Sequence, residues 1–228
     1  DMMMEKRFPE IIEEMLKKEG REYVRAVGIC ISASVDTEHS IVHLGGFSKL
    51  RIEREVARSV QILSEKINLP VYLFNDVNAA AVGEYVLRKM KKEDLVYVYV
   101  SEGTGAGIIL EGKLRTGKHF YSGEIAHMVF ETDFVTDRRK PGWMERKLSF
   151  KSIEESAQSR EGQVDYAARY ISLVIANICN TMDIQNVVLG GEIIQFLGQA
   201  LFEKTRSYLD RLQLFPINLT RYVNENSD

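Results

Sequence analysis

The sequence predicts an α/β fold with a mostly parallel sheet, and three observations lead to it. Apolar residues recur at helical spacing, first over residues 8–16 and again over residues 52–67. Short β-rich apolar runs alternate with these helical segments, an order typical of a parallel sheet covered by helices. With 228 residues, the chain is near the length at which one core begins to divide into two lobes.

The same patterns place each element. Helices are expected over residues 8–16, 52–67, 77–90 and 164–182, and from Gly191 to about Leu212. Strands are expected over residues 24–32, 41–44, 71–74, 95–101, 106–110 and 186–189. The stretch 117–142 is polar and contains glycine, so it is expected to be irregular, and its basic cluster at residues 138–140 is interpreted as a solvated loop.

Composition narrows the class of protein. A formal net charge of −3 argues against a nucleic-acid-binding surface spread over the whole body. Cys30 and Cys179 lie in apolar runs without ligand-like spacing, so both are expected to be buried free thiols in a reducing compartment. No apolar stretch reaches the roughly 18 residues of a membrane helix, and the first residues do not resemble a signal peptide. We therefore expect a cytoplasmic protein with no membrane partner.

Three segments follow predicted strands, where ligands gather in α/β sheets: Asn75-Asp76, the turn from Gly103 to Gly107, and Gly190-Gly191. Asp76 has two interpretations. It is either a helix N-cap, worth about 1 kcal/mol, or a carboxylate that accepts a proton from a substrate hydroxyl. Position favours the cap, although Asn75 could cap the helix equally well.

The glycine-rich turn and the glycine pair also have two interpretations each. Their backbone amides could approach an anion closely, or they could be ordinary turns built from small residues. The candidate nucleotide-binding residues, in a degenerate form of such a site, are Gly103, Thr104, Gly105, Gly190 and Gly191.

Glu124 and His127 stand three residues apart in a loop. A carboxylate beside an imidazole suits adjacent sugar hydroxyls. The pair could equally bind a metal, but further ligands are not evident nearby, and a lone Glu and His are more often structural.

Taken together, these segments resemble the ROK family of sugar kinases and sugar-responsive repressors. VYLFNDVNAAAVGE (residues 71–84) is similar to the family's strand, Asn-Asp pair and alanine-rich helix, and GAGIILEGKLRTG (105–117) to the hairpin after its second phosphate motif. SGEIAHM (122–128) resembles its Gly-Glu-x-Gly-His signature, with Ala126 in place of the second glycine, and VVLGG (187–191) its adenosine-side strand. Order and spacing agree from about residue 8 to residue 212.

The resemblance implies an actin-like, hexokinase-type (ribonuclease H-like) fold with α/β lobes around a cleft. Residues 1–75 would form the remainder of the first lobe, without its opening hairpin, and residues 76–228 the second, with a sugar-site loop over residues 117–149. It also implies that Asp76 is the catalytic base in a kinase. The implied sugar-binding residues are Asn75, Asp76, Glu124, His127 and Glu145.

Glu145 is included because Gly-Trp-Met-Glu, ending at that residue, is similar to the Gly-Cys-Leu-Glu that closes the family's zinc-binding loop. Trp143 stands in place of that cysteine, and Thr136 and Arg138 fall where the first two cysteines would be. Without thiolates, structural zinc is not expected, and no other metal site is expected either. We interpret Trp143 as anchoring the loop by burying its ring.

Departures from the family bear on kinase versus repressor. The first phosphate motif, an Asp-x-Gly-Gly-Thr turn, is missing, and the second has Ser101 and Glu102 in place of its leading Gly-Thr. Glu192 adds another acid after Gly191. A carboxylate roughly 4 Å from a phosphate charge costs about 1 kcal/mol in water and about 4 at an effective dielectric near 20, so ATP binding is expected to be weak. His43 replaces a sugar-contacting asparagine of the family, which leaves the identity of the sugar open.

The preferred interpretation is a sugar-binding effector domain of a ROK transcriptional regulator. It would form a homodimer, bind ATP and Mg²⁺ only if it were a kinase, and reach DNA only through a helix-turn-helix module that is not present in this sequence. The alternative is an ATP-dependent kinase of a hexose or N-acetylhexosamine, with Asp76 as general base and with ATP and Mg²⁺. A degenerate member that only dimerises ranks last.

Overall fold

The computed structural model describes residues 6–43, 49–131 and 142–222, apart from the side chains of residues 43 and 49–56. The chain divides into two compact units, Asp1–Ala79 and Ala80–Asp228. Helix α3 (Asp76–Leu87) contains the boundary between them, whereas the sequence placed it at the start of that helix. Among the helices of the described ranges, none combines the length and apolar composition that crossing a bilayer requires.

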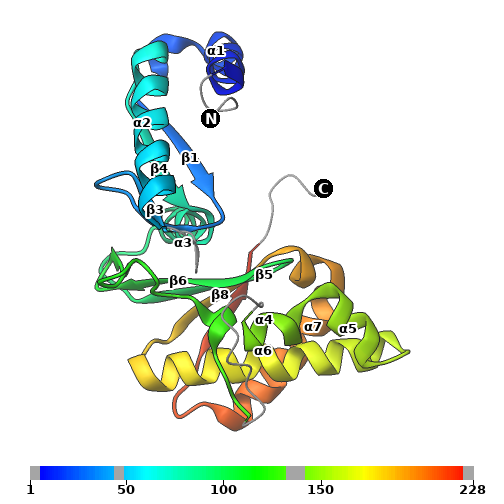
Figure 1. Cartoon of the computed structure of the whole chain (residues 1–228). Coiled ribbons are helices and arrows are strands. Elements are labelled where there is room, and N and C mark those ends of the chain that lie inside the picture. Colours follow the sequence, from blue (N-terminus) through cyan, green and yellow to red (C-terminus); the bar gives the residue numbers. More distant parts are fainter. Residues whose placement is uncertain (1–5, 44–48, 132–141, 223–228) are drawn as a thin grey trace. The chain divides into compact units, whose positions relative to one another are not determined.

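The first unit packs two helices against short strands (Figure 1). Strands β1 (Val27–Ile31) and β4 (Val71–Asn75) pair in parallel, with Val27 opposite Val71 and Ile31 opposite Asn75. Strands β2 (Ser34–Asp36) and β3 (Ile41–His43) form a separate antiparallel pair. The helices are α1 (Phe8–Glu19) and α2 (Lys49–Ile67). Their apolar faces meet the strands in a small core that includes Ile12, Leu16, Leu63, Ile67 and Leu73.

The second unit is built on a five-stranded sheet in the order β7-β6-β5-β8-β9. Its strands are β5 (Leu95–Val100), β6 (Thr104–Leu110), β7 (Lys113–Leu114), β8 (Asn186–Gly190) and β9 (Asn218–Arg221). The pairs β5-β6 and β6-β7 are antiparallel, and β5-β8 and β8-β9 are parallel. The prediction of a mostly parallel sheet is therefore wrong here. The chain returns through tight turns after β5 and β6, and such turns can join only antiparallel neighbours.

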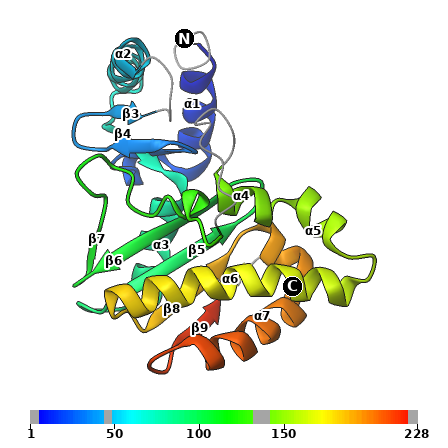
Figure 2. The ribbon, with the colours of Figure 1, turned by 60° about the horizontal axis from the view of Figure 1, so that its bottom comes forward.

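Two long helices, α6 (Arg160–Met182) and α7 (Glu192–Leu212), lie side by side on one face of this sheet (Figure 2). Every second residue of β5 faces them, because side chains alternate along a strand, so Val96, Val98 and Val100 are buried in the main core. From α6, Ile171, Val174, Ile175 and Ile178 enter the same core, as the helical spacing predicted. Helix α7 is kinked at Gly198, whose backbone is not helical.

The helices α4 (Trp143–Leu148) and α5 (Phe150–Ser156) were not predicted. They contain six and seven residues, too few for an apolar period to emerge. Two serines in the sequence nevertheless mark the starts of helices. The hydroxyl of Ser149 accepts a hydrogen bond from the backbone N of Ser152 (3.2 Å), and Ser159 caps α6 in the same way through the N of Gly162 (3.1 Å).

The two cysteines differ in environment. Cys179 is fully buried on α6, and burial raises the pKa of its thiol to about 12. Cys30 is exposed, so the prediction that both thiols are buried is wrong for this residue. Its position in β1 explains the difference, because exposure alternates along that strand and Cys30 lies at one of the more exposed positions.

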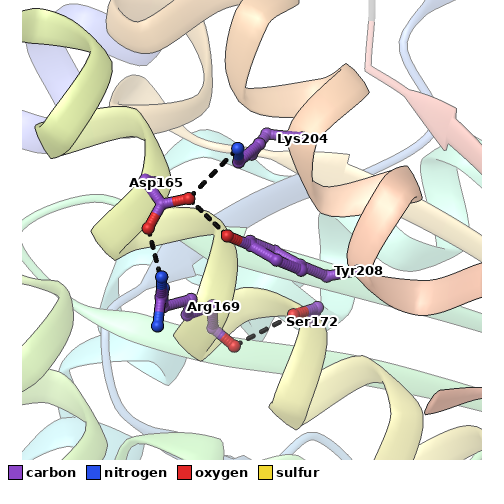
Figure 3. Close-up of polar contacts among 5 residues, drawn as sticks. All are labelled: Asp165, Arg169, Ser172, Lys204 and Tyr208. Carbon is purple, nitrogen blue, oxygen red and sulfur yellow. Dashed lines mark hydrogen bonds and ion pairs between the residues drawn. The ribbon is translucent and has the colours of Figure 1, made fainter. Parts of the chain in front are cut away.

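Asp165 of α6 joins two donors of α7, Lys204 and Tyr208, and a third donor, Arg169, lies on α6 itself (Figure 3). The hydroxyl of Tyr208 donates to Oδ1, Nζ of Lys204 lies 3.2 Å from the same oxygen, and Nε of Arg169 donates to Oδ2 at 2.7 Å. These contacts, led by the tyrosine hydrogen bond, lower the pKa of Asp165 to about 2. The carboxylate therefore holds the two core helices together while it is ionised.

We predict that Asp165→Asn lowers the free energy of unfolding by about 2 kcal/mol at pH 7. The native pKa lies below the ordinary value of 3.8, so the stabilisation is complete above about pH 4 and is lost as the pH falls through about 2. Urea unfolding of wild type and variant between pH 7 and pH 2 measures this difference. Asp210→Asn, at an exposed position of α7, is the control. A deficit that does not shrink in acid would contradict the assignment.

Candidate functional site

The three candidate segments each follow a strand. Strand β4 ends at Asn75, β5 at Val100 and β8 at Gly190. Since β5 and β8 are parallel neighbours, with Tyr99 opposite Gly190, the glycine-rich turn and the glycine pair lie at the same edge of the second unit's sheet. The Asn-Asp pair belongs to the first unit.

The structure separates the roles of Asn75 and Asp76. Oδ1 of Asn75 accepts a hydrogen bond from the backbone N of Asn78 (2.8 Å), which is the capping contact of α3. Nδ2 of Asn75 also donates to the carbonyl of Ala33 (3.1 Å). Asp76 accepts only from the adjacent N of Val77 (2.9 Å) within the described part of the chain. Asn75 is thus the cap, and the carboxylate of Asp76 retains most of its capacity to accept hydrogen bonds.

The glycine-rich turn is shorter than the run of small residues suggested. The backbone N of Ser101 donates to the carbonyl of Gly103 (2.9 Å), and β6 begins at Thr104. Gly105 lies inside that strand, opposite Tyr99. Thr104 is buried, with 7% of its surface exposed, and its hydroxyl has no hydrogen-bond partner among the described residues. Such a group costs free energy unless a ligand or water satisfies it.

An acid occupies the edge of the sheet next to this turn. The hydroxyl of Ser101 donates to Oε2 of Glu192, the first residue of α7, at 3.0 Å. Gly191 makes this approach possible: its φ is 106°, and a Cβ there would lie 2.2 Å from the carbonyl O of Val100. A helix N-terminus favours negative charge and is a common phosphate site, and here a carboxylate of the chain itself is in that place.

The remaining candidates come from two packed elements of the second unit. Glu124 directly precedes the short 3₁₀ helix η3 (Ile125–His127), and His127 is its last residue. Both are exposed, and Glu145 is half-buried on α4. A Cβ on Gly142 would lie 2.1 Å from the carbonyl O of Ala126, so only glycine lets the start of α4 approach η3 so closely.

The glycine-rich turn belongs to the same cluster. Oε1 of Glu145 lies 3.7 Å from where a Cβ on Gly103 would be. Glu145 thus lies beside the glycine-rich turn, and its helix packs against η3, which carries His127. No group of three or more His, Cys, Asp or Glu in the described ranges is arranged to hold a metal ion.

Trp143 is buried at the start of α4, with 4% of its surface exposed. Its ring meets Phe130 and Tyr170 edge to face, at centroid distances of 6.1 and 6.0 Å. This is the packing expected of an aromatic anchor. Thr136 and Arg138, and the side chain of His43, lie outside the described residues.

A family model, the ROK family, matches residues 3–142 and 131–221 of the chain. The chain belongs to the ROK family. Among its curated relatives is the xylose repressor of Caldicellulosiruptor bescii, which is 28% identical over 240 aligned residues (89% of this chain and 59% of that protein). The N-acetylmannosamine kinase of Escherichia coli is 33% identical over 155 residues (59% and 53%). The chain thus spans little more than half the length of these two ROK relatives.

Solved ROK structures share the fold. A ROK family transcriptional regulator, a homologue of the E. coli MLC protein, matches with a TM-score of 0.77 at 18% identity, over 96% of this chain and 64% of that one. A ROK family glucokinase from Streptomyces griseus, in complex with glucose and AMPPNP, gives 0.73 at 20% identity, over 93% and 81%. The fold is therefore the actin-like α/β fold of these proteins, which serves both regulators and kinases.

The sequence singled out Ser101 and Glu192 separately, but the hydrogen bond that joins them was not predicted. The strand partners held the necessary signal, because parallel pairing of the runs at residues 95–101 and 186–189 would have placed the ends of both at one edge.

We predict different stability effects at the two positions of the Asn-Asp pair. Asn75→Ala should lower the free energy of unfolding by about 1 kcal/mol, because it removes the cap of α3. Asp76→Asn should change it by less than about 0.5 kcal/mol, because the described residues give this side chain no hydrogen bond except that from its neighbour Val77. Urea titrations followed by circular dichroism measure both values. Equal losses would mean that Asp76 also has a structural role.

Proposed function

We propose that this ROK chain is the sugar-binding effector part of a transcriptional regulator. A sugar would bind to hydroxyl-binding side chains that include Asn75, Asp76, Glu124, His127 and Glu145. Binding would shift the balance between two arrangements of the units, and a DNA-binding module would report that shift. A homodimer in the cytoplasm that needs no metal or nucleotide is part of the same proposal.

The observation that carries the preference over a kinase is the Ser101–Glu192 hydrogen bond. A kinase must surround the phosphates of ATP with donors and positive charge. This chain instead holds a carboxylate at the N-terminus of α7, beside the turn that resembles the phosphate motif, and Glu102 is exposed next to it. The repressor named among the relatives supports the same choice, as does the regulator among the solved structures.

The alternative is an ATP-dependent kinase of a hexose or N-acetylhexosamine, with Asp76 as the base and Mg²⁺ on the nucleotide. One observation favours it. Asn75 takes over the capping role, so Asp76 is left with the acceptor capacity that a general base needs. The N-acetylmannosamine kinase among the relatives supports this alternative.

We predict that the protein binds a sugar without turning over ATP. Calorimetry with pentoses, hexoses and N-acetylhexosamines should find one class that binds. Glu124→Gln and Glu145→Gln should each weaken that binding about tenfold or more, because each removes a charged hydrogen-bond acceptor. Glu93→Gln, at an exposed position outside the candidate set, is the matched control. If no sugar of the panel binds, the result counts against a sensor. Sugar-dependent ADP release that disappears in Asp76→Asn establishes the kinase.

We further predict that Glu192→Gln tightens the binding of Mg²⁺–ATP by about fivefold, because one like charge near the phosphates is worth about 1 kcal/mol in a water-like medium. The amide oxygen of glutamine still accepts the Ser101 hydrogen bond, so the turn is kept while the charge is lost. Calorimetric titration of both proteins gives the ratio. Tight binding by the wild type, unchanged in the variant, would remove the main argument against a kinase.

A further inference from the structure

A cavity in the second unit is lined by none of the candidate sugar residues. It has a volume of about 350 Å³ and is formed by α4, α5 and the first part of α6. Besides Trp143, its lining consists of Arg146, Lys147, Ser152, Glu155, Ser156 and Tyr166. Small-molecule sites have volumes of roughly 300–1,000 Å³, so this cavity could hold a compact metabolite.

Arg146 is the feature that calls for a ligand. Its Nε atom is buried and makes no hydrogen bond to the part of the chain that the structure describes. A guanidinium is permanently charged, and leaving one of its donors buried without an acceptor costs free energy. Planar oxyanions match its paired donors in two-pronged geometry.

Lys147 adds a second positive charge with a fixed position. Its Nζ lies 4.9 Å from the centre of the Trp143 ring and 5.8 Å from that of Tyr170. Among the described residues, the carboxylate of Glu131 lies 4.0 Å from this Nζ, on a side chain that is 53% exposed. An ion pair that long and that open to water contributes little, so the ammonium remains available to a ligand.

The other lining groups are compatible with an anion. Tyr166 lines the cavity as a neutral phenol, because desolvation raises the pKa of its hydroxyl to about 12. Ser152 and Ser156 donate to the carbonyls of Arg146 and Ile153, so the two hydroxyls help to shape the cavity wall. Glu155 is the one acid of the lining, and its exposed carboxylate lies 3.8 Å from Lys151.

We infer that the cavity between α4, α5 and α6 binds an oxyanion of the phosphate class, held by Arg146 and Lys147. The ligand is either free phosphate or the phosphate group of a small metabolite. This site is separate from the residues of the proposed sugar site. Of those residues, Glu145 also lies on α4 and directly precedes Arg146, but its carboxylate lies near Gly103. An anion would therefore steady the helix that carries a candidate sugar ligand. That consequence rests on the proposed function, whereas anion binding itself does not.

The test uses Trp143, the single tryptophan of the chain, as the reporter, because it lies in the cavity wall beneath Lys147. Inorganic phosphate and glycerol 3-phosphate are titrated at constant ionic strength while tryptophan fluorescence is followed. We expect a saturable change in the wild type. The dissociation constant should rise at least tenfold in Arg146→Met and in Lys147→Met. Lys151→Met, a neighbouring lysine whose side chain is 81% exposed, should stay within twofold of the wild type.

Arg146→Lys guards against a misfolded Arg146→Met protein, because it keeps the charge and loses only the two-pronged geometry. It should bind phosphate more weakly than the wild type while its circular dichroism is unchanged. Tighter binding of glycerol 3-phosphate than of phosphate identifies a phosphorylated metabolite, and equal binding identifies the free ion. No saturable signal with either probe, or the same dissociation constant in every variant, overturns the site. A chain that binds phosphate but no sugar refutes the proposed function alone.

Discussion

The parallel pairing of β5 with β8 is the constraint on which the second unit depends. It places the ends of two strands that are about ninety residues apart in the chain at one edge of a sheet, in register from Leu95–Asn186 to Tyr99–Gly190. The glycine at 191 then lets α7 begin against the carbonyl of Val100. As a result, the turn after β5 is brought into contact with the first residue of α7. In this chain those two positions are a serine and a glutamate.

That contact fixes which charge stands at the start of α7. The regulator and the glucokinase among the solved structures share the fold that builds this edge. An acid at the start of α7 stabilises the helix by a fraction of a kcal/mol through the helix dipole, and it opposes a phosphate in the same place by a similar or larger amount. In this chain, the acid at position 192 therefore opposes a phosphate at the start of α7.

Much of the fold could be predicted from the sequence because long elements carry a readable period. Strand β5, with alternating valines, was placed to within one residue. The end of helix α6, with Ile171 and Ile175 on its buried side, was also placed correctly, but the helix begins four residues earlier than predicted. Helices α4 and α5 were not predicted, since six or seven residues are too few to show a helical pattern of apolar residues. The capping residue Ser149 was the local sign of a helix. The sheet was misjudged because strand direction is set by pairing partners, and local patterns do not contain them.

The candidate site was predictable to a lesser degree. Glu124, His127 and Glu145 could be proposed from short motifs, and the structure packs the elements that carry the last two against each other. Which member of the Asn-Asp pair caps α3 could not be decided, because both side chains can do so and only the backbone geometry chooses. The cationic cavity depends on three helices, two of them unpredicted, so no motif pointed to Arg146.

The unequal environments of the two cysteines give the molecule a practical property. Thiol-directed dyes react with the thiolate, which the buried residue on α6 scarcely forms at neutral pH, since burial raises its pKa to about 12. The residue on β1 is exposed, so a dye can reach it. A single fluorophore can therefore be attached to the first unit of the unaltered protein, while the lone tryptophan reports from the second. The chain thus carries a natural donor and an attachment point for an acceptor, one in each unit.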